Sequence, residues 1–202
     1  MLKIESQNNN WKKIIMKVTQ TSIGGVVKIQ PNVHLDNRGY FFESFKSSDF
    51  EAHGLPSKFV QDNQAKSSKG VLRGLHYQLN FAQGKLVWVS EGKVLDVAVD
   101  IRKGSPTFGQ FESALLDNET HTRFYIPPGF AHGYFVLSET AIFQYKCTDV
   151  YHPEDEYGIY WDDPEIGIEW GIGDKLVSEK DHILPLLKDM DPNLLPMYRE
   201  KN

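Results

Sequence analysis

The chain has 202 residues, of which 40% are hydrophobic and 24% are charged, a balance typical of a folded protein rather than a disordered one. The formal net charge of -5 and the lack of a long basic block argue against a nucleic-acid partner. No apolar run reaches the roughly 18–20 residues of a membrane span, so no membrane partner is expected. The single cysteine, Cys147, excludes an intramolecular disulfide. Since the first residues do not read as a secretory signal, a cytoplasmic location is expected.

Residues 1–15 are expected to form a loosely ordered N-terminal extension, and residues 16–202 a single domain. From Met16 onward, apolar and polar residues alternate in short bursts separated by turn sequences such as Asp36-Asn37-Arg38-Gly39. These bursts predict strands at Val26–Pro31, Tyr40–Phe45, Val71–Gln78, Lys85–Ser90, Val94–Ile101, Phe108–Leu116, Thr122–Ile126, Gly133–Leu137 and Ala141–Thr148.

Helix is expected only in short pieces. Ser48 is predicted to cap a helix that runs to His53, with Glu51 completing a capping box and Gly54 ending it. The leucine-rich stretch 182–195 favours irregular or short helical segments. Many short strands at even spacing predict a mainly β fold, an antiparallel sandwich or barrel with a few short peripheral helices.

Two stretches carry the polar groups of a binding site. Residues 70–78 read Gly-Val-Leu-Arg-Gly-Leu-His-Tyr-Gln, and residues 127–132 read Pro-Pro-Gly-Phe-Ala-His. They resemble the two halves of the metal site in double-stranded β-helix (cupin) domains, where the first half supplies His-x-His and a glutamate and the second a final histidine. Here Gln78 stands at the second histidine place, and Lys85 follows. Because a metal would repel that ammonium, we expect no metal and a site for an organic anion or a developing negative charge.

Strand alternation places His76 and Gln78 on one face, whereas Arg73 has the parity opposite to Leu72 and Gly74. A lone histidine of this kind is more often a core residue bonded to the backbone than a functional group. A functional role is favoured here because His76 is expected to share a barrel lumen with other polar side chains, namely Arg73, Gln78, Lys85 and His132.

Three further residues each have a structural alternative. Lys85 could be a solvated lysine at a sheet edge, and Tyr145 could fill the core. Asp181 could merely close a capping box with Ser178. Taken one at a time, these residues are explained by structure alone.

Longer strings follow one another from about Met16 to about Leu187, at Asp36–Phe45, Phe59–Asn63, Gly70–Gln78, Gln83–Val87, Ser105–Gln110, Ile126–Gly133, Tyr145–Thr148 and Ser178–Asp181. Together they resemble the dTDP-4-dehydrorhamnose 3,5-epimerases. The strings are long and stand in the same order as in that family, so a chance match is remote.

The resemblance implies a cupin-fold homodimer that needs no metal or other cofactor. The implied substrate is dTDP-4-dehydro-6-deoxy-D-glucose, whose C3 and C5 are both inverted on the route to dTDP-L-rhamnose. By the same resemblance His76 is the general base, and Asp181 holds its other ring nitrogen. Lys85 faces the C4 oxygen, and Tyr145 returns a proton from the opposite face of the sugar.

The resemblance also implies substrate contacts from charged and polar side chains, at Arg38, Glu43, Gln61, Asp62, Asn63, Arg73, His132, Glu156 and Lys180. Arginine suits a diphosphate because its fork matches phosphate oxygens. Arg38 and Glu43 are expected to reach the site of the partner subunit, so that dimerisation completes the pocket. An aromatic ring is expected to stack on thymine, with Phe41, Tyr151 and Trp170 as candidates.

Three alternatives stay open. An epimerase that inverts one centre of a related nucleotide keto-sugar would share this fold. A metal-dependent cupin oxygenase would use His76 and His132 as ligands, but the missing second histidine and Lys85 weigh against it. A sugar-binding jelly roll without catalysis would not need His76.

Overall fold

The computed structural model describes residues 16–199. The expected N-terminal extension, residues 1–15, lies outside the described residues, as do residues 200–202. Among the helices of residues 16–199, none is long and apolar enough to cross a membrane.

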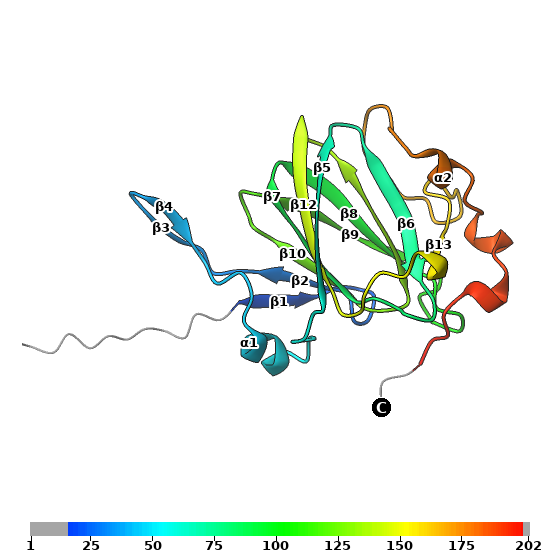
Figure 1. Ribbon diagram of the computed structural model, residues 1–202, viewed down its shortest axis with the longest axis horizontal. Coiled ribbons are helices and arrows are strands. Elements are labelled where there is room, and N and C mark those ends of the chain that lie inside the picture. Colours follow the sequence, from blue (N-terminus) through cyan, green and yellow to red (C-terminus); the bar gives the residue numbers. More distant parts are fainter. Residues whose placement is uncertain (1–15, 200–202) are drawn as a thin grey trace, which may run out of the picture.

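Two antiparallel sheets pack face to face (Figure 1). The six-stranded sheet has the order β1 (Lys17–Gln20), β2 (Val27–Gln30), β10 (Arg123–Ile126), β7 (Lys85–Glu91), β12 (Thr140–Cys147) and β5 (Gln61–Ser68). The five-stranded sheet has the order β13 (Glu156–Gly158), β6 (Leu72–Gln78), β11 (Phe130–Val136), β8 (Lys93–Asp100) and β9 (Phe111–Asp117). The predicted mainly β, cupin-type fold is confirmed.

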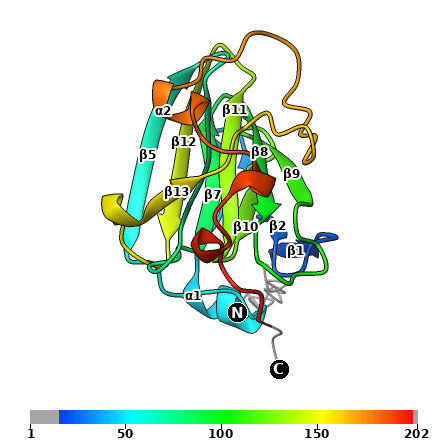
Figure 2. The ribbon, with the colours of Figure 1, turned by 90° about the vertical axis from the view of Figure 1, so that its right-hand side faces the viewer.

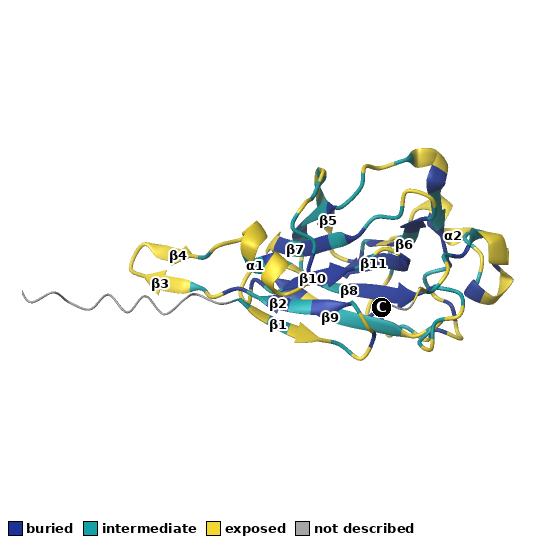
Figure 3. Ribbon diagram, turned by 90° about the horizontal axis from the view of Figure 1, so that it is seen from below, coloured by how far each residue is buried: buried dark blue, intermediate teal, exposed yellow. Residues whose placement is uncertain are grey.

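A separate hairpin of β3 (His34–Asp36) and β4 (Gly39–Phe41) projects away from the two sheets (Figure 1). Figure 3 shows it as exposed, in contrast to the buried strands of the body. Leu35 and Phe41 are 80% and 69% exposed, which is unusual for large apolar side chains.

The main core lies between the sheets, and alternation along the strands builds it. On β7, Val87 and Val89 point into this layer, while Leu86 points to the outer face and packs with Phe50 of the first helix. The outer face of the five-stranded sheet is covered by the chain that follows β13, shown in orange and red in Figure 2. Trp170 is buried in that covering layer.

The helices are short: α1 (Ser47–Ala52), α2 (Glu179–His182) and 3₁₀ turns at Pro153–Asp155, Leu187–Asp189 and Pro192–Leu194. The predicted cap of α1 is wrong, because Lys46 is the N-cap residue and no side chain caps the helix. Its predicted end is confirmed, since Gly54 has φ +69° and donates its N–H to the Glu51 carbonyl at 2.9 Å. The last segments of the described chain are short and helical, as expected.

Several strand predictions need correction. The strand predicted at 40–45 overlaps β4 only at residues 40–41, the one at 108–116 begins later at Phe111, and the one at 133–137 begins earlier at Phe130. Four strands were not predicted at all: β1, β3, β5 and β13. In β5 the sequence Gln-Asp-Asn-Gln-Ala-Lys-Ser-Ser has almost no apolar residues, because one face of this edge strand lines a polar cavity and the other faces solvent.

Candidate active site

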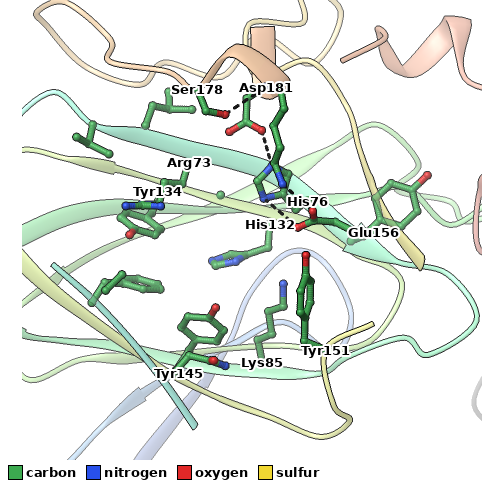
Figure 4. Close-up of a pocket in the computed structure, with 18 of the residues that line it drawn as sticks. Arg73, His76, Lys85, His132, Tyr134, Tyr145, Tyr151, Glu156, Ser178 and Asp181 are labelled. Atoms are coloured by element: carbon green, nitrogen blue, oxygen red, sulfur yellow. Dashed lines mark hydrogen bonds and ion pairs between the residues drawn. The ribbon is translucent and has the colours of Figure 1, made fainter. Parts of the chain in front are cut away.

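A cavity of about 780 Å³ lies between the two sheets, and the polar residues singled out in the sequence gather around it (Figure 4). The six-stranded sheet lines it with Gln61, Asn63, Lys85, Phe143 and Tyr145. The five-stranded sheet and the segments beside it contribute Arg73, His76, Gln78, His132, Tyr134, Tyr151, Glu156, Ser178, Lys180 and Asp181. A cavity of this volume can hold a small organic ligand.

His76 and Asp181 form a close pair on one wall. The His76 Nε2 atom lies 2.7 Å from Asp181 Oδ1, and the Asp181 side chain also accepts the Gly74 N–H at 3.4 Å. Burial alone would raise the pKa of Asp181, but hydrogen bonds from His76, Gly74 and Ser178 outweigh it and hold that pKa below its usual range. A charged carboxylate is therefore fixed against the imidazole and orients the ring.

Only half of the capping box expected between Ser178 and Asp181 is present. Ser178 caps α2 and accepts the backbone N–H of Asp181 at 3.3 Å. The Asp181 carboxylate, however, turns to His76. One short helix thus fixes the backbone while leaving the side chain free for the imidazole.

Arg73 shares this wall although strict alternation would place it on the other face from His76. Between β6 and β11 the register shifts, so that His76 pairs with His132 but Arg73 pairs with Tyr134. The shift adds one residue to β6 at Gly74, where φ is +123° and an added Cβ would lie 2.6 Å from Gly133 Cα. A bulge that only glycine fits therefore turns Arg73 into the cavity.

Lys85 and Tyr145 stand on the opposite wall (Figure 4). Tyr145 pairs with Val87 across β12 and β7, which places its side chain on the same face as Lys85. Burial lowers the pKa of Lys85, although Cys147, Glu156 and Asp96 oppose the shift. Within residues 16–199 its ammonium forms no ion pair, so it is available to a ligand anion. Burial also raises the pKa of Tyr145 to about 12, so the phenol is protonated at neutral pH.

His132 has its own carboxylate, Asp96, which the sequence analysis missed. The His132 Nε2 atom lies 2.9 Å from Asp96 Oδ2, and Asp96 is 0% exposed. Burial raises the pKa of Asp96, while His132 and Lys85 oppose the shift. The available signal was a charged residue inside the otherwise apolar stretch Val94–Val99.

Glu156 and Lys180 lie together at the cavity. Lys180 Nζ is 2.6 Å from Glu156 Oε2, and Glu156 Oε1 is 3.9 Å from His76 Nδ1. Burial would raise the pKa of Glu156, but Lys180, His76 and Tyr151 lower it overall. Tyr151 is 46% exposed and lines the same region, so a flat ring is available there for stacking.

Not every predicted contact residue reaches the cavity. Gln61 and Asn63 line it, whereas Asp62 points to the other side of β5 and pairs with Lys146 at 2.7 Å. Arg38 lies on the projecting hairpin, and Glu43 lines a separate small recess, so neither lines this cavity. Of the stacking candidates, Trp170 is excluded because it is 3% exposed in the covering layer.

Gln78, at the place of a second metal-binding histidine, is bonded to the backbone. Its amide donates to the Phe81 carbonyl at 2.7 Å and accepts the His152 N–H at 2.8 Å. Among residues 16–199, no three His, Cys, Asp or Glu side chains converge as a set of metal ligands. The donor set of a metal-dependent cupin is therefore not assembled in this part of the chain.

Fold and cavity together define the class: a cupin-type protein with acid and base groups on two facing walls. The family model for dTDP-4-dehydrorhamnose 3,5-epimerase matches residues 20–189. A dTDP-4-dehydrorhamnose 3,5-epimerase of Pseudomonas aeruginosa is 52% identical over 178 residues, which cover 87% of this chain and 98% of that relative. The chain belongs to the dTDP-4-dehydrorhamnose 3,5-epimerase family.

Two solved structures resemble this one closely. A dTDP-6-deoxy-D-glucose-3,5-epimerase from Legionella pneumophila, in complex with dTDP-4-keto-L-rhamnose, matches with a TM-score of 0.89 and 50% identity over 92% of this chain and 100% of that chain. A 3'-monoepimerase from Streptomyces bikiniensis, in complex with dTDP-quinovose, matches with a TM-score of 0.83 and 36% identity, covering 88% of this chain and 92% of that chain.

Proposed function

We propose that this protein is an epimerase that inverts C3 and C5 of dTDP-4-dehydro-6-deoxy-D-glucose to give dTDP-4-dehydro-L-rhamnose, in the biosynthesis of dTDP-L-rhamnose. The observation that carries the proposal is the placement of His76 and Tyr145 on facing walls of one cavity, with Lys85 beside Tyr145. The relative in complex with dTDP-4-keto-L-rhamnose supports the same substrate class.

The chemistry follows from the C4 ketone, which acidifies the protons on both neighbouring carbons. His76 takes the proton from C5 or C3, and the electron pair of that C–H bond becomes an enolate with its charge on the C4 oxygen. Asp181 stabilises the imidazolium that results. A proton is then returned to the same carbon from the opposite face by Tyr145, which inverts the centre.

Lys85 stabilises the enolate. Its ammonium has no anionic partner within the described residues. Because Lys85 is buried, water competes little with it for the enolate oxygen. A positive charge fixed in a site with little water stabilises a nearby negative charge more strongly than the same charge does in bulk solvent, and Lys85 lies where that negative charge develops.

The proposed substrate contacts in this cavity are Gln61, Asn63, Arg73, His132, Glu156 and Lys180. The ring of Tyr151 is proposed to stack on thymine.

We further propose that the protein is a homodimer in which Arg38 and Glu43 reach the partner's cavity. The exposed apolar residues of the β3–β4 hairpin support this.

No cofactor is assigned to the reaction, and the enzyme is proposed to work in the cytoplasm. The unpaired, buried Cys147 fits a reducing compartment. Activity that survives dialysis against a chelator is the expected outcome, and loss of activity that zinc or iron restores would favour the oxygenase-type alternative.

NMR in heavy water tests the reaction itself. The wild type should exchange deuterium into both C3 and C5 of the keto-sugar and, with a reductase, deliver the L-sugar. Exchange at one carbon alone would make the protein a single-centre epimerase, like the monoepimerase it resembles at 36% identity. The Tyr145→Phe variant should still exchange protons but fail to deliver product inverted at C5; normal product would remove Tyr145 from its role.

A further inference from the structure

Tyr134 is a cavity residue without a role in the chemistry above. It follows His132 by two residues on β11, so both side chains point to the cavity face. Tyr134 is 5% exposed, and its ring stacks on Phe143 with centroids 4.0 Å apart. Its hydroxyl has no hydrogen-bond partner within residues 16–199. Because an unpaired buried hydroxyl costs free energy, a partner is expected in the working enzyme.

The neighbour of this phenol is Arg73, which Figure 4 shows beside the Tyr134 ring at one end of the cavity. Arg73 is exposed, and in the described part of the chain its side chain forms no ion pair. It makes one long hydrogen bond there, from Nε to Ser67 Oγ at 3.4 Å. Burial raises the pKa of Tyr134, and the nearby Ser67 and Arg73 oppose that shift. A protonated phenol and a weakly held guanidinium therefore share one end of the cavity.

We propose that Tyr134 positions Arg73 for substrate recognition. The phenol oxygen accepts one guanidinium N–H, and its own O–H is donated to Ser67. The other N–H groups of Arg73 then point at an acceptor oxygen of the nucleotide sugar. An arginine fork has only donors, whereas a phenol can accept and donate at once, so the pair is complementary. The inference rests on the proposed function, because it takes a nucleotide sugar as the ligand.

The Tyr134→Phe variant tests this, since it removes the oxygen and keeps the ring on Phe143. We expect KM to rise about threefold to tenfold and kcat to stay within about twofold, the pattern of lost uniform binding. In an Arg73→Met background the same change should have no further effect, because no guanidinium remains to be positioned. Tyr125→Phe is the matched control: this buried tyrosine lies outside the cavity, and its variant should keep the wild-type KM.

Calorimetry with dTDP and with dTDP-glucose shows which oxygen of the nucleotide sugar Arg73 contacts. Weaker binding of both ligands by Tyr134→Phe assigns this oxygen to the diphosphate, and weaker binding of dTDP-glucose alone assigns it to the sugar. A wild-type KM for Tyr134→Phe, or an equal effect with and without Arg73, overturns the inference. Turnover of the keto-sugar by the wild type in the same assay tests the proposed function separately.

Discussion

His76 and Asp181 are 105 residues apart in the sequence, and their side chains meet at 2.7 Å. The contact joins a strand of the five-stranded sheet to the short helix α2, which lies beside it. Asp181 is 2% exposed, so water competes little with the imidazole for the carboxylate. The position of the His76 ring is therefore set by a segment that folds against β6 from near the end of the described chain.

The Asp181→Asn variant should lose about 10²–10⁴-fold in kcat, because a neutral amide cannot stabilise the imidazolium. A coupled assay with the keto-sugar and its reductase measures the loss. Asp163→Asn is the matched control: Asp163 is 3% exposed and accepts the backbone N–H groups of Glu165 and Leu187, away from the cavity. It should lower the melting temperature and leave kcat unchanged. A loss below about tenfold for Asp181→Asn would show that His76 works without it.

The pH profile should fall on its alkaline side because of Lys85. If its ammonium form stabilises the enolate as proposed, activity persists while the lysine is protonated and is lost as pH rises through its lowered pKa. The midpoint should therefore lie below 10.5, the usual lysine value. Tyr145 cannot cause this fall, since burial raises its pKa to about 12. Measured as kcat/KM, the fall should also appear in the proton exchange catalysed by Tyr145→Phe; a midpoint above 10.5 would count against Lys85.

The Gly74→Ala variant should be destabilised by at least about 2 kcal/mol and should lose activity. An alanine there meets Gly133 Cα at 2.6 Å and is held at φ +123°, so the bulge that turns Arg73 toward the cavity cannot form. Urea unfolding measures the loss. Gly24→Ala is the control, because an added Cβ there has no neighbour within 4 Å. Equal stabilities for the two variants would mean that β6 accommodates a side chain at this point.

Mixed dimers test whether Arg38 serves the partner's cavity. Homodimers of Arg38→Ala and of His76→Ala should each be nearly inactive. After the two are mixed under conditions that exchange subunits, about a quarter of the wild-type activity should return, because half of the dimers are then mixed and each has one intact site. Size-exclusion chromatography with light scattering confirms the dimer. No recovery despite proven exchange would place Arg38 in its own subunit's site, and a fully active Arg38→Ala homodimer would place it outside any site.

The sequence alone determined the class of fold and the main chemical groups. Strands with an apolar face, such as the one around Val87, are visible because burial demands alternation. The residues His76, Lys85, Tyr145 and Asp181 could be chosen because they lie in long family strings. Polar edge strands such as β5 gave no signal, because one face of β5 lines a cavity with polar side chains and its other face is exposed to solvent, so neither face has an apolar pattern.

Only the tertiary structure decided which side chains share the cavity. Arg73 joins His76 through a one-residue bulge, and a shift of one residue turns a side chain to the other face of a sheet. Alternation along β5 also points the Asp62 side chain away from the cavity, toward Lys146. Asp96 and Tyr134 became visible through their buried surroundings, because the cost of burying a polar group depends on neighbours that are distant in sequence.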